Sequence, residues 1–335
     1  MIVQEHVDLT PYNTLGFAAV AERLVTPKTD DECRKALALA RAHDWPITLL
    51  GKGSNVILQP VINGLVIVPS SQVYRFESVG ADTVKVHADA GVDWPTLVEK
   101  ACEQGLWGIE NLALIPGHCG AAPVQNIGAY GAELADVLEC VHLLHFDGRQ
   151  ETLSGVQAQF GYRDSVFKRA LAGRCLITGI VLKLSTVPHP QLGYGDLAAR
   201  VSMPCTPLDV AHAVSAIRRE KLPDPKVIGN AGSFFKNPVI TLEHAAVLRQ
   251  RYPQMPVFAN EEGSKVPAAW LIDQCGFKGC HRGTVGVHDR QALVLVNRGG
   301  GDAAALLALA DEIENAVHDH FGISLEREPR VIGYA

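Results

Sequence analysis

Arg163 and Ser233 are the two residues whose type and setting best suit catalysis. Arg163 stands between Tyr162 and Asp164, and an arginine offers an anion a permanent charge and a rigid fork of donors. Ser233 follows Gly232 and precedes two phenylalanines, so small neighbours leave its hydroxyl accessible. Each has a structural alternative. Arg163 could be an ordinary surface residue or could pair with an aspartate such as Asp164, and Ser233 could bond the backbone of its own turn.

Acidic and basic residues flank these positions. Glu326 and Glu328 are two apart on an expected strand and would share one face, although exposed glutamates at a sheet edge are common. Lys221, Lys226 and Lys236 surround the Ser233 turn and could hold phosphate, or could be ordinary surface lysines. The 13 histidines form no set with metal-ligand spacing, so no metal site is expected.

Two glycine-rich segments could bind a ligand through their backbone. Residues 115–131 read IPGHCGAAPVQNIGAYG and contain no Lys, Arg, Asp or Glu. Glycine is costly to order, so it collects where the backbone approaches a ligand or needs unusual dihedrals; a buried Gly/Ala-rich crossing is the alternative. Residues 51–55, GKGSN, have neither the third glycine nor the following helix of a dinucleotide fingerprint, yet such a turn can hold a pyrophosphate.

The elements that position these segments alternate between strands and short helices. A strand is expected to end at Val25, and further strands are expected at 47–50, 56–59, 65–68, 84–88, 137–146, 175–184, 292–297 and 323–333. Helices are expected at 29–43, 93–105, 206–221, 241–251, 267–275 and 302–320, the first with a capping box of Thr29 and Glu32. Hairpins among the strands indicate an α+β fold rather than a doubly wound parallel sheet.

Composition excludes several classes of protein. The 335 residues are 47% hydrophobic and 20% charged, with a net charge of −6, which fits a globular protein and gives no nucleic-acid footprint. No apolar run has the length of a membrane span and no signal peptide is visible, so we expect a cytoplasmic protein. The eight cysteines are scattered, and we expect reduced, mostly buried thiols.

Seven motifs together resemble one family, the UDP-N-acetylenolpyruvoylglucosamine reductases, over residues 10–333. The motifs are NTLG from Asn13, GKGSN, IPGHCGAAPVQNIGAYG, FGYRDS from Phe160, YGD from Tyr194, LPDPK and GNAGSFFKNP. The YGD segment is similar to that of the type I branch. The resemblance implies an FAD-containing, NADPH-dependent oxidoreductase that makes UDP-N-acetylmuramate for peptidoglycan, acts on small molecules alone and is a monomer without membrane insertion.

The same resemblance implies a mechanism and roles for residues. Hydride passes from NADPH to FAD and then to the enolpyruvyl β-carbon, and the α-carbon is protonated. Ser233 is implied as the proton donor, with Arg163 and Glu328 at the substrate carboxylate. Tyr162, Tyr194, Lys221 and Asn237 are implied as substrate contacts, with Tyr194 on a closing loop. The implied FAD contacts are Gly51, Gly53, Ser54, Asn55, Pro116, Gly117, Gly120, Ala121, Ala122, Gln125, Asn126, Gly128 and Ala129.

Two departures from the family pattern stand out. The end reads Glu326-Arg327-Glu328-Pro329 where the family often has Glu-Pro-Glu. Counting back from Ile332-Gly333 favours Glu328 as the catalytic glutamate but leaves Glu326 open. Many members carry serines where this chain has Ala121 and Ala122, so a hydroxyl contact to FAD would be missing.

The domains implied are a non-Rossmann FAD-binding domain at 1–190, a linker at 191–206 and a substrate-binding domain at 207–335. The first, similar to the vanillyl-alcohol oxidase and PCMH folds, has two α+β subdomains divided near residue 70. The linker carries the Tyr194 loop, and the final strand, 323–333, returns to the active site. Two rival functions remain: an FAD-dependent alcohol or sugar oxidase of the same fold, and a nucleotide-sugar-binding protein without catalysis.

Overall fold

The computed structural model describes residues 1–260 and 263–333. Their contacts divide the chain into two units. Unit 1 contains Met1–Val7, Ala21–Lys52 and Asn63–Glu220. Unit 2 contains Asp8–Val20, Gly53–Ile62 and Lys221–Ala335. The chain therefore passes from one unit to the other inside the GKGSN turn, between Lys52 and Gly53.

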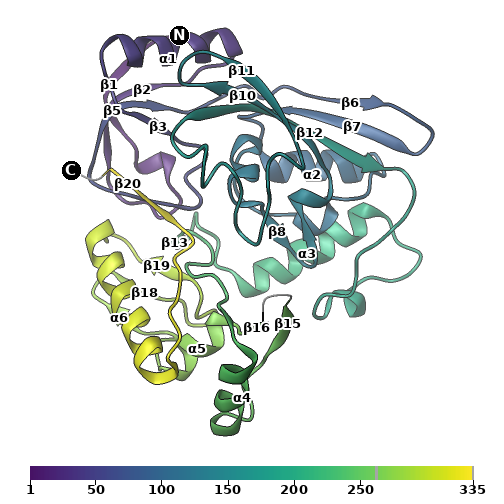
Figure 1. The fold of residues 1–335 in the computed structure, drawn as a ribbon, viewed down its shortest axis with the longest axis vertical. Coiled ribbons are helices and arrows are strands. Elements are labelled where there is room, and N and C mark those ends of the chain that lie inside the picture. Colours follow the sequence, from purple (N-terminus) through teal and green to yellow (C-terminus); the bar gives the residue numbers. More distant parts are fainter. Residues whose placement is uncertain (261–262, 334–335) are drawn as a thin grey trace. The chain divides into compact units, whose positions relative to one another are not determined.

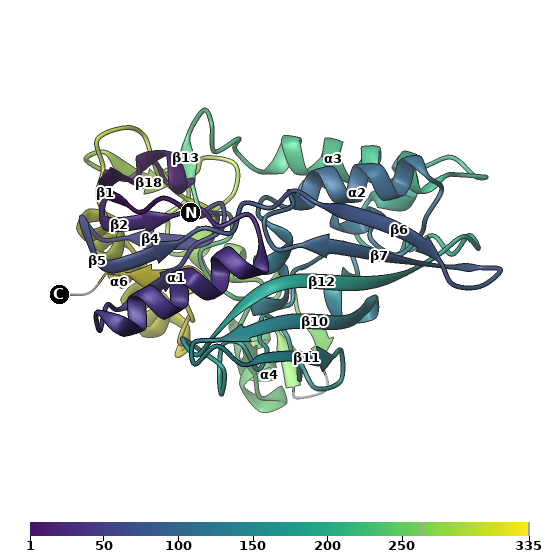
Figure 2. The same cartoon turned by 90° about the horizontal axis from the view of Figure 1, so that it is seen from above.

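Unit 1 is built on two sheets. A four-stranded sheet has the order β1 (Gln4–Asp8), β2 (Val20–Val25), β5 (Val61–Ile67), β3 (Ile47–Leu49). A five-stranded sheet, whose strands run side by side across Figure 2, has the order β11 (Gln150–Ser154), β10 (Leu138–His145), β12 (Cys175–Ser185), β7 (Thr83–Asp89), β6 (Tyr74–Ser78). All pairings in this second sheet are antiparallel, whereas β3 and β5 run parallel.

Helices cover these sheets with their apolar faces. α1 (Asp30–Ala42) buries Cys33, Ala36, Leu37 and Ala40 in a core with Leu65 and Ile67 of β5. α2 (Trp94–Glu103) and α3 (Pro207–Lys221), both visible in Figure 2, contribute to the core of the five-stranded sheet. The unit also contains η2 (Glu110–Leu112), η3 (Cys119–Gln125), β8 (Gly128–Ala129), β9 (Ala132–Glu133), η4 (Leu134–Asp136) and η5 (Leu197–Arg200).

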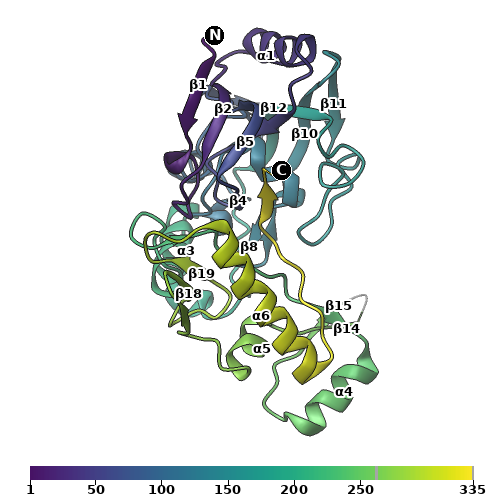
Figure 3. The ribbon, with the colours of Figure 1, turned by 90° about the vertical axis from the view of Figure 1, so that its left-hand side faces the viewer.

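Unit 2 packs helices against short strands. One sheet has the order β13 (Gly229–Asn230), β19 (Leu295–Asn297), β18 (Val285–Val287), β17 (His281–Arg282), and another the order β14 (Val239–Ile240), β16 (Gly263–Lys265), β15 (Phe258–Asn260). α6 (Ala303–Phe321) lies beside α5 (Ala268–Gln274) and β18 (Figure 3). α4 (Leu242–Arg251), η1 (Thr10–Tyr12) and the parallel pair β4 (Val56–Leu58) and β20 (Arg330–Ile332) complete the unit (Figure 1).

Most of the expected elements form. Several short strands were not predicted, among them β1 and β14 to β18, and three further details differ. β6 was not predicted from the sequence, and the last strand is shorter than predicted: only Arg330–Ile332 is a strand, preceded by an isolated bridge at Arg327. The capping box of α1 is half formed. Thr29 accepts from the Glu32 amide at 3.2 Å, but the Glu32 carboxylate accepts from Lys28 N instead of from Thr29.

All eight cysteines are free; Cys33, Cys102, Cys119 and Cys175 are buried and the other four are intermediate in exposure, so the predicted burial holds for half of them. Burial raises the pKa of the Cys33 and Cys102 thiols to about 12. No helix among the described residues is long and apolar enough to cross a membrane. Within the same residues, no cluster of His, Cys, Asp and Glu is arranged to hold a metal ion.

Candidate functional site

The GKGSN turn contains two glycines with different surroundings. Gly53 has a φ of +63°, and a Cβ placed on it would lie 2.0 Å from the Tyr12 carbonyl oxygen. The fold itself therefore requires glycine at this position. A Cβ at Gly51 would instead make ordinary contacts of 3.6–3.8 Å with Ala121 and His118. None of the described residues forbids a side chain at Gly51, so its bare backbone suits a ligand that approaches closely.

The 115–131 stretch is fastened to the rest of unit 1 by its own residues. A Cβ at Gly120 would lie 2.6 Å from the Cβ of Ala90, so close packing accounts for this glycine. Asn126 is buried in a left-handed conformation with φ +45°. Its amide donates to Glu133 Oε2 and Gly161 O, and its oxygen accepts from Ala135 N. The Asn126 side chain is thus committed to protein contacts.

The positions predicted to bind FAD differ in exposure to solvent. Pro116 and Ala121 are exposed, and Gly53, Gly117, Ala122 and Asn126 are buried. The intermediate positions are Gly51, Ser54, Asn55, Gly120, Gln125, Gly128 and Ala129. Gly51 and residues 115–131 belong to unit 1, whereas Gly53, Ser54 and Asn55 belong to unit 2. The contact of Gly51 with His118 and Ala121 brings the two glycine-rich segments together within unit 1.

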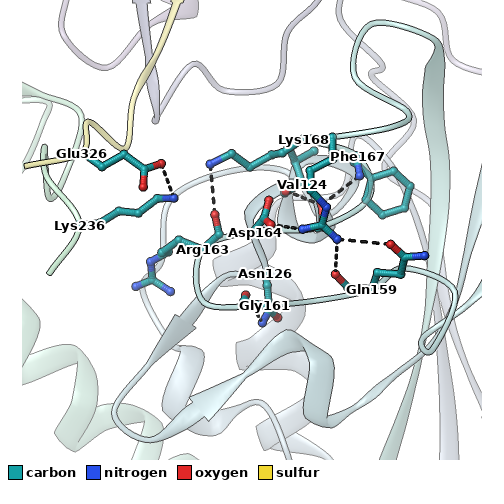
Figure 4. Close-up of polar contacts among 12 residues, drawn as sticks. Val124, Asn126, Gln159, Gly161, Arg163, Asp164, Phe167, Lys168, Lys236 and Glu326 are labelled. Atoms are coloured by element: carbon teal, nitrogen blue, oxygen red, sulfur yellow. Dashed lines mark hydrogen bonds and ion pairs between the residues drawn. The ribbon is translucent and has the colours of Figure 1, made fainter. Parts of the chain in front are cut away.

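Arg163 is directed toward the glycine-rich stretch and not toward its neighbour in sequence. Its Nη2 donates to Gly128 O at 2.9 Å, and its guanidinium carbon lies 5.5 Å from the ring centroid of Tyr162. Asp164 forms its ion pair with Arg169 (Figure 4). Pairing of Arg163 with Asp164, one of the structural alternatives, is therefore wrong. Arg163 also has a φ of +54°, which is uncommon for a side chain of this size.

The Tyr194 segment rests on the end of the glycine-rich stretch. The rings of Tyr194 and Tyr130 meet edge to face, with centroids 5.7 Å apart. Buried Asn111 joins the same two segments, because its amide donates to Tyr130 O at 2.7 Å and to Gln191 O at 2.8 Å. Sequence analysis did not single out Asn111. Its position in a short 3₁₀ turn gave no signal of this role.

Arg218, on α3, is a second residue that the sequence analysis missed. Its Nε is enclosed and has no hydrogen-bond partner, and no carboxylate pairs with it anywhere in residues 1–260 or 263–333. Burial lowers the pKa of the Arg218 guanidinium, and the charge of Arg163 lowers it further, while Tyr130 acts in the opposite direction. Two cations near one another without a carboxylate on Arg218 favour an anionic ligand. One arginine among several on a helix carried no such signal.

In unit 2 the Ser233 turn is held by buried neighbours. Phe234 and Phe235 are almost fully buried, and Ser233 is half-buried. Thr14 Oγ1 donates to Asn230 O at 2.7 Å and so fixes the approach to the turn. Among the described residues, the Ser233 hydroxyl forms no hydrogen bond with its own backbone. The alternative role of a turn-capping serine therefore finds no support.

The two glutamates near the C-terminus have different partners. Glu326 forms an ion pair with Lys236 at 2.5 Å (Figure 4). The Lys236 side chain is 13% exposed. Glu328 is half-buried, its N–H donates to Phe234 O at 2.8 Å, and its carbonyl accepts from Asn55 Nδ2 at 3.3 Å. Unit 2 thus brings Asn55, the Ser233 turn and Glu328 together. Lys236 is engaged by Glu326 instead of remaining open to phosphate.

The other residues predicted to contact substrate occupy varied settings. Tyr194 is 59% exposed and Tyr162 37% exposed. Lys221 is exposed at the last residue of α3. Asn237 accepts from Ala268 N at 2.9 Å and so caps the start of α5, which leaves its amide nitrogen, and not its oxygen, for a ligand.

Comparison with known proteins first defines the class. A family model described as an FAD binding domain matches residues 21–154, and one described as the UDP-N-acetylenolpyruvoylglucosamine reductase C-terminal domain matches residues 224–332. The chain is therefore a flavoprotein oxidoreductase with a PCMH-type FAD-binding domain and a second α+β domain. The expected fold class is confirmed.

Full-length relatives then give the family. The chain is 46% identical to the UDP-N-acetylenolpyruvoylglucosamine reductase of Chromobacterium violaceum, over 97% of this chain and 98% of the relative. It is 45% identical to that of Pseudomonas aeruginosa, over 98% of each. The crystal structure of the reductase from Thermus caldophilus superposes with a TM-score of 0.70 at 27% identity, covering 99% of both chains. The chain belongs to the UDP-N-acetylenolpyruvoylglucosamine reductase family, and its activity is the FAD- and NADPH-dependent reduction that supplies a peptidoglycan precursor.

Proposed function

We propose that this chain performs the family reaction with Ser233 as the proton donor and with Arg163 and Glu328 at the substrate carboxylate. Gly51 and residues 115–131 would hold FAD, which would supply the hydride-transfer chemistry between NADPH and the enolpyruvyl β-carbon. Negative charge then develops at the α-carbon, beside an existing carboxylate. The protein must balance this charge and supply one proton.

Each of the three residues meets one of these needs. The Arg163 guanidinium presents a rigid fork of cationic donors and can offset the developing anion. Donors placed at such charge commonly contribute about a hundredfold in rate. A carbanion-like carbon is basic enough to take a proton from the neutral hydroxyl of Ser233 at hydrogen-bond distance. Glu328 can assist when it is protonated or accepts a donor in the complex.

The observation that carries this proposal is the chain of backbone contacts inside unit 2. Asn55 donates to the carbonyl of Glu328, and the Glu328 amide donates to Phe234, next to Ser233. The turn predicted to hold FAD is thereby linked to the proposed proton donor and to the acidic residue. In unit 1, the hydrogen bond from Arg163 to Gly128 gives Arg163 a corresponding place against the glycine-rich stretch.

The remaining assignments belong to the same proposal. Gly51 and residues 115–131 fit FAD through their bare or small-residue backbone, and Tyr194, Lys221 and Asn237 contact the sugar nucleotide. Residues 1–190 form the FAD-binding domain, 191–206 the linker with the Tyr194 loop, and 207–335 the substrate-binding domain. The YGD segment places the chain in the type I branch. We expect a cytoplasmic monomer.

The test measures the rates of the two half-reactions separately, by rapid mixing, in the Ser233→Ala variant. Flavin reduction by NADPH should remain normal, and reoxidation by the enolpyruvyl substrate should slow by about a hundredfold or more. Ser233→Cys, which keeps an acidic proton, should recover part of the loss. Ser78→Ala, at an exposed serine of β6, is the matched control. Equal impairment of both half-reactions would show that Ser233 is not the proton donor.

A further inference from the structure

His118 lies where the two glycine-rich segments meet in unit 1. Its backbone pairs with Asp93 in an isolated antiparallel bridge. Both the Cβ and Nδ1 of His118 are 3.8 Å from the position that a Cβ on Gly51 would occupy. Lys52, the next residue of the turn, forms an ion pair with Asp93. A lysine, an imidazole and a bare glycine backbone therefore share one small region.

The hydrogen bonding of the imidazole is incomplete. Its Nδ1 is buried without a partner, and within the described part of the chain Nε2 has no protein partner either. The residue as a whole is half-buried, so Nε2 is the ring nitrogen that keeps access to the outside. Burying an N–H donor without an acceptor is costly. The neutral ring is therefore best accommodated with its proton on Nε2.

The charges around His118 favour this neutral form in the protein without cofactor. Burial lowers the pKa of His118, and the nearby charge of Lys52 lowers it further, while Asp93 acts in the opposite direction. Burial alone would raise the pKa of Asp93, but hydrogen bonds from Lys52 and Thr96 hold it below its ordinary value. Lys52 and Asp93 thus remain a charged pair, and His118 presents one N–H.

We propose that His118 is a phosphate-contacting side chain of the FAD site, donating from Nε2 to a pyrophosphate oxygen. The inference rests on the proposed placement of FAD at Gly51 and residues 115–131. His118 adds a polar donor to a segment in which Ala121 and Ala122 carry no hydroxyl. His118 lies three residues before Ala121 in the sequence and supplies a hydrogen-bond donor. The charge of Lys52 is close to its ring.

The experiment measures FAD affinity by fluorescence titration of protein stripped of its cofactor. His118→Ala should weaken FAD binding about tenfold to a hundredfold, as expected for loss of a hydrogen bond to a charged group. His118→Gln places an amide donor near the Nε2 position and should recover most of the affinity. His281→Ala, at an exposed histidine of β17, should match the wild type. FAD affinity of His118→Ala within about twofold of wild type would overturn the proposal.

A second measurement needs no variant. Proton–nitrogen correlation NMR of the wild-type imidazoles should show the His118 proton on Nε2 and a shift of that resonance when FAD is added. An unchanged His118 signal on FAD binding would also overturn the proposal. Unchanged FAD affinity of Gly51→Ala would instead refute the proposed placement of the cofactor, so the two failures are distinguishable.

Discussion

Gly51 and Gly53 lie two positions apart in one turn, but only Gly53 is required by the protein. A Cβ at Gly53 would overlap the Tyr12 carbonyl, whereas one at Gly51 would make ordinary contacts. We therefore expect Gly53→Ala to lower the free energy of unfolding by about 2 kcal/mol or more. Gly51→Ala should change it by less than about 0.5 kcal/mol and still weaken FAD binding about tenfold.

Urea denaturation of the cofactor-free variants and FAD titration provide the two readouts. The glycines serve as controls for each other, because the substitution is the same and only the surroundings differ. If Gly51→Ala bound FAD as tightly as the wild type, the cofactor would not approach the backbone at that residue.

Glu326 and Glu328 can also serve as controls for each other, because they are the same residue type in different surroundings. Glu326 is engaged by Lys236, and Glu328 is tied through its backbone to Phe234 and Asn55. We expect Glu328→Gln to slow substrate-dependent flavin reoxidation by about a hundredfold, and Glu326→Gln to slow it by less than about threefold. Single-turnover rates for both variants check this. The reverse order would transfer the catalytic role to Glu326.

At the scale of elements, the spacing of apolar residues and the capping residues correctly predicted the helices whose structure depends on local sequence. α1 buries the four residues that its spacing marked, and α2 has Asp93 as its N-cap and Pro95 in its first turn. β6 was missed because its residues, YRFES, are mostly solvent-exposed and carry little apolar signal. The predicted strand at 323–333 was too long, because regular pairing is available only beside β4, for Arg330–Ile332.

The site was predictable to the extent that residue type reveals function. Glycine-rich backbone, a serine among small neighbours and a lone arginine are visible in a sequence. Hydrogen-bond partners that are distant in sequence are not visible. The role of Asn111 was missed for this reason, because its two acceptors lie 19 and 80 residues away in the chain. The unpaired Nε of Arg218 and the environment of His118 are likewise properties of tertiary packing.

Asn111 provides a prediction about the element that carries Tyr194. Asn111→Ala removes two hydrogen bonds and leaves the carbonyls of Tyr130 and Gln191 without their donor, so the segment after Gln191 should become more mobile. We expect faster proteolysis of residues 191–197 and a KM for the sugar nucleotide raised about tenfold, with flavin reduction by NADPH little changed.

Asn63→Ala, at an exposed asparagine of β5, is the control for this change. If Asn111→Ala lowered thermal stability but left both proteolysis of 191–197 and KM at wild-type values, Asn111 would be a core residue without influence on the Tyr194 segment.

At the scale of the whole molecule, one buried carboxyl links folding to pH. Glu110 is 2% exposed, and burial raises its pKa above the ordinary 4.5, although the Gly108 N–H donates to Oε2 at 2.6 Å and opposes the shift. The unfolded chain releases this proton near pH 4.5, and the folded protein retains it to higher pH. The contribution of Glu110 to stability is therefore full below pH 4.5 and declines as pH rises through the folded-state value.

Glu110→Gln removes this titration while keeping a similar shape and an oxygen acceptor for Gly108. We expect the stability of the variant relative to the wild type to increase between pH 4.5 and pH 8, measured by urea unfolding at several pH values. Glu103→Gln, at an exposed residue of α2, should show no comparable trend. A difference between Glu110→Gln and wild type that stayed constant over this range would mean that Glu110 ionises alike in the folded and unfolded chain, and that its burial is compensated by the Gly108 hydrogen bond and the charge of His189.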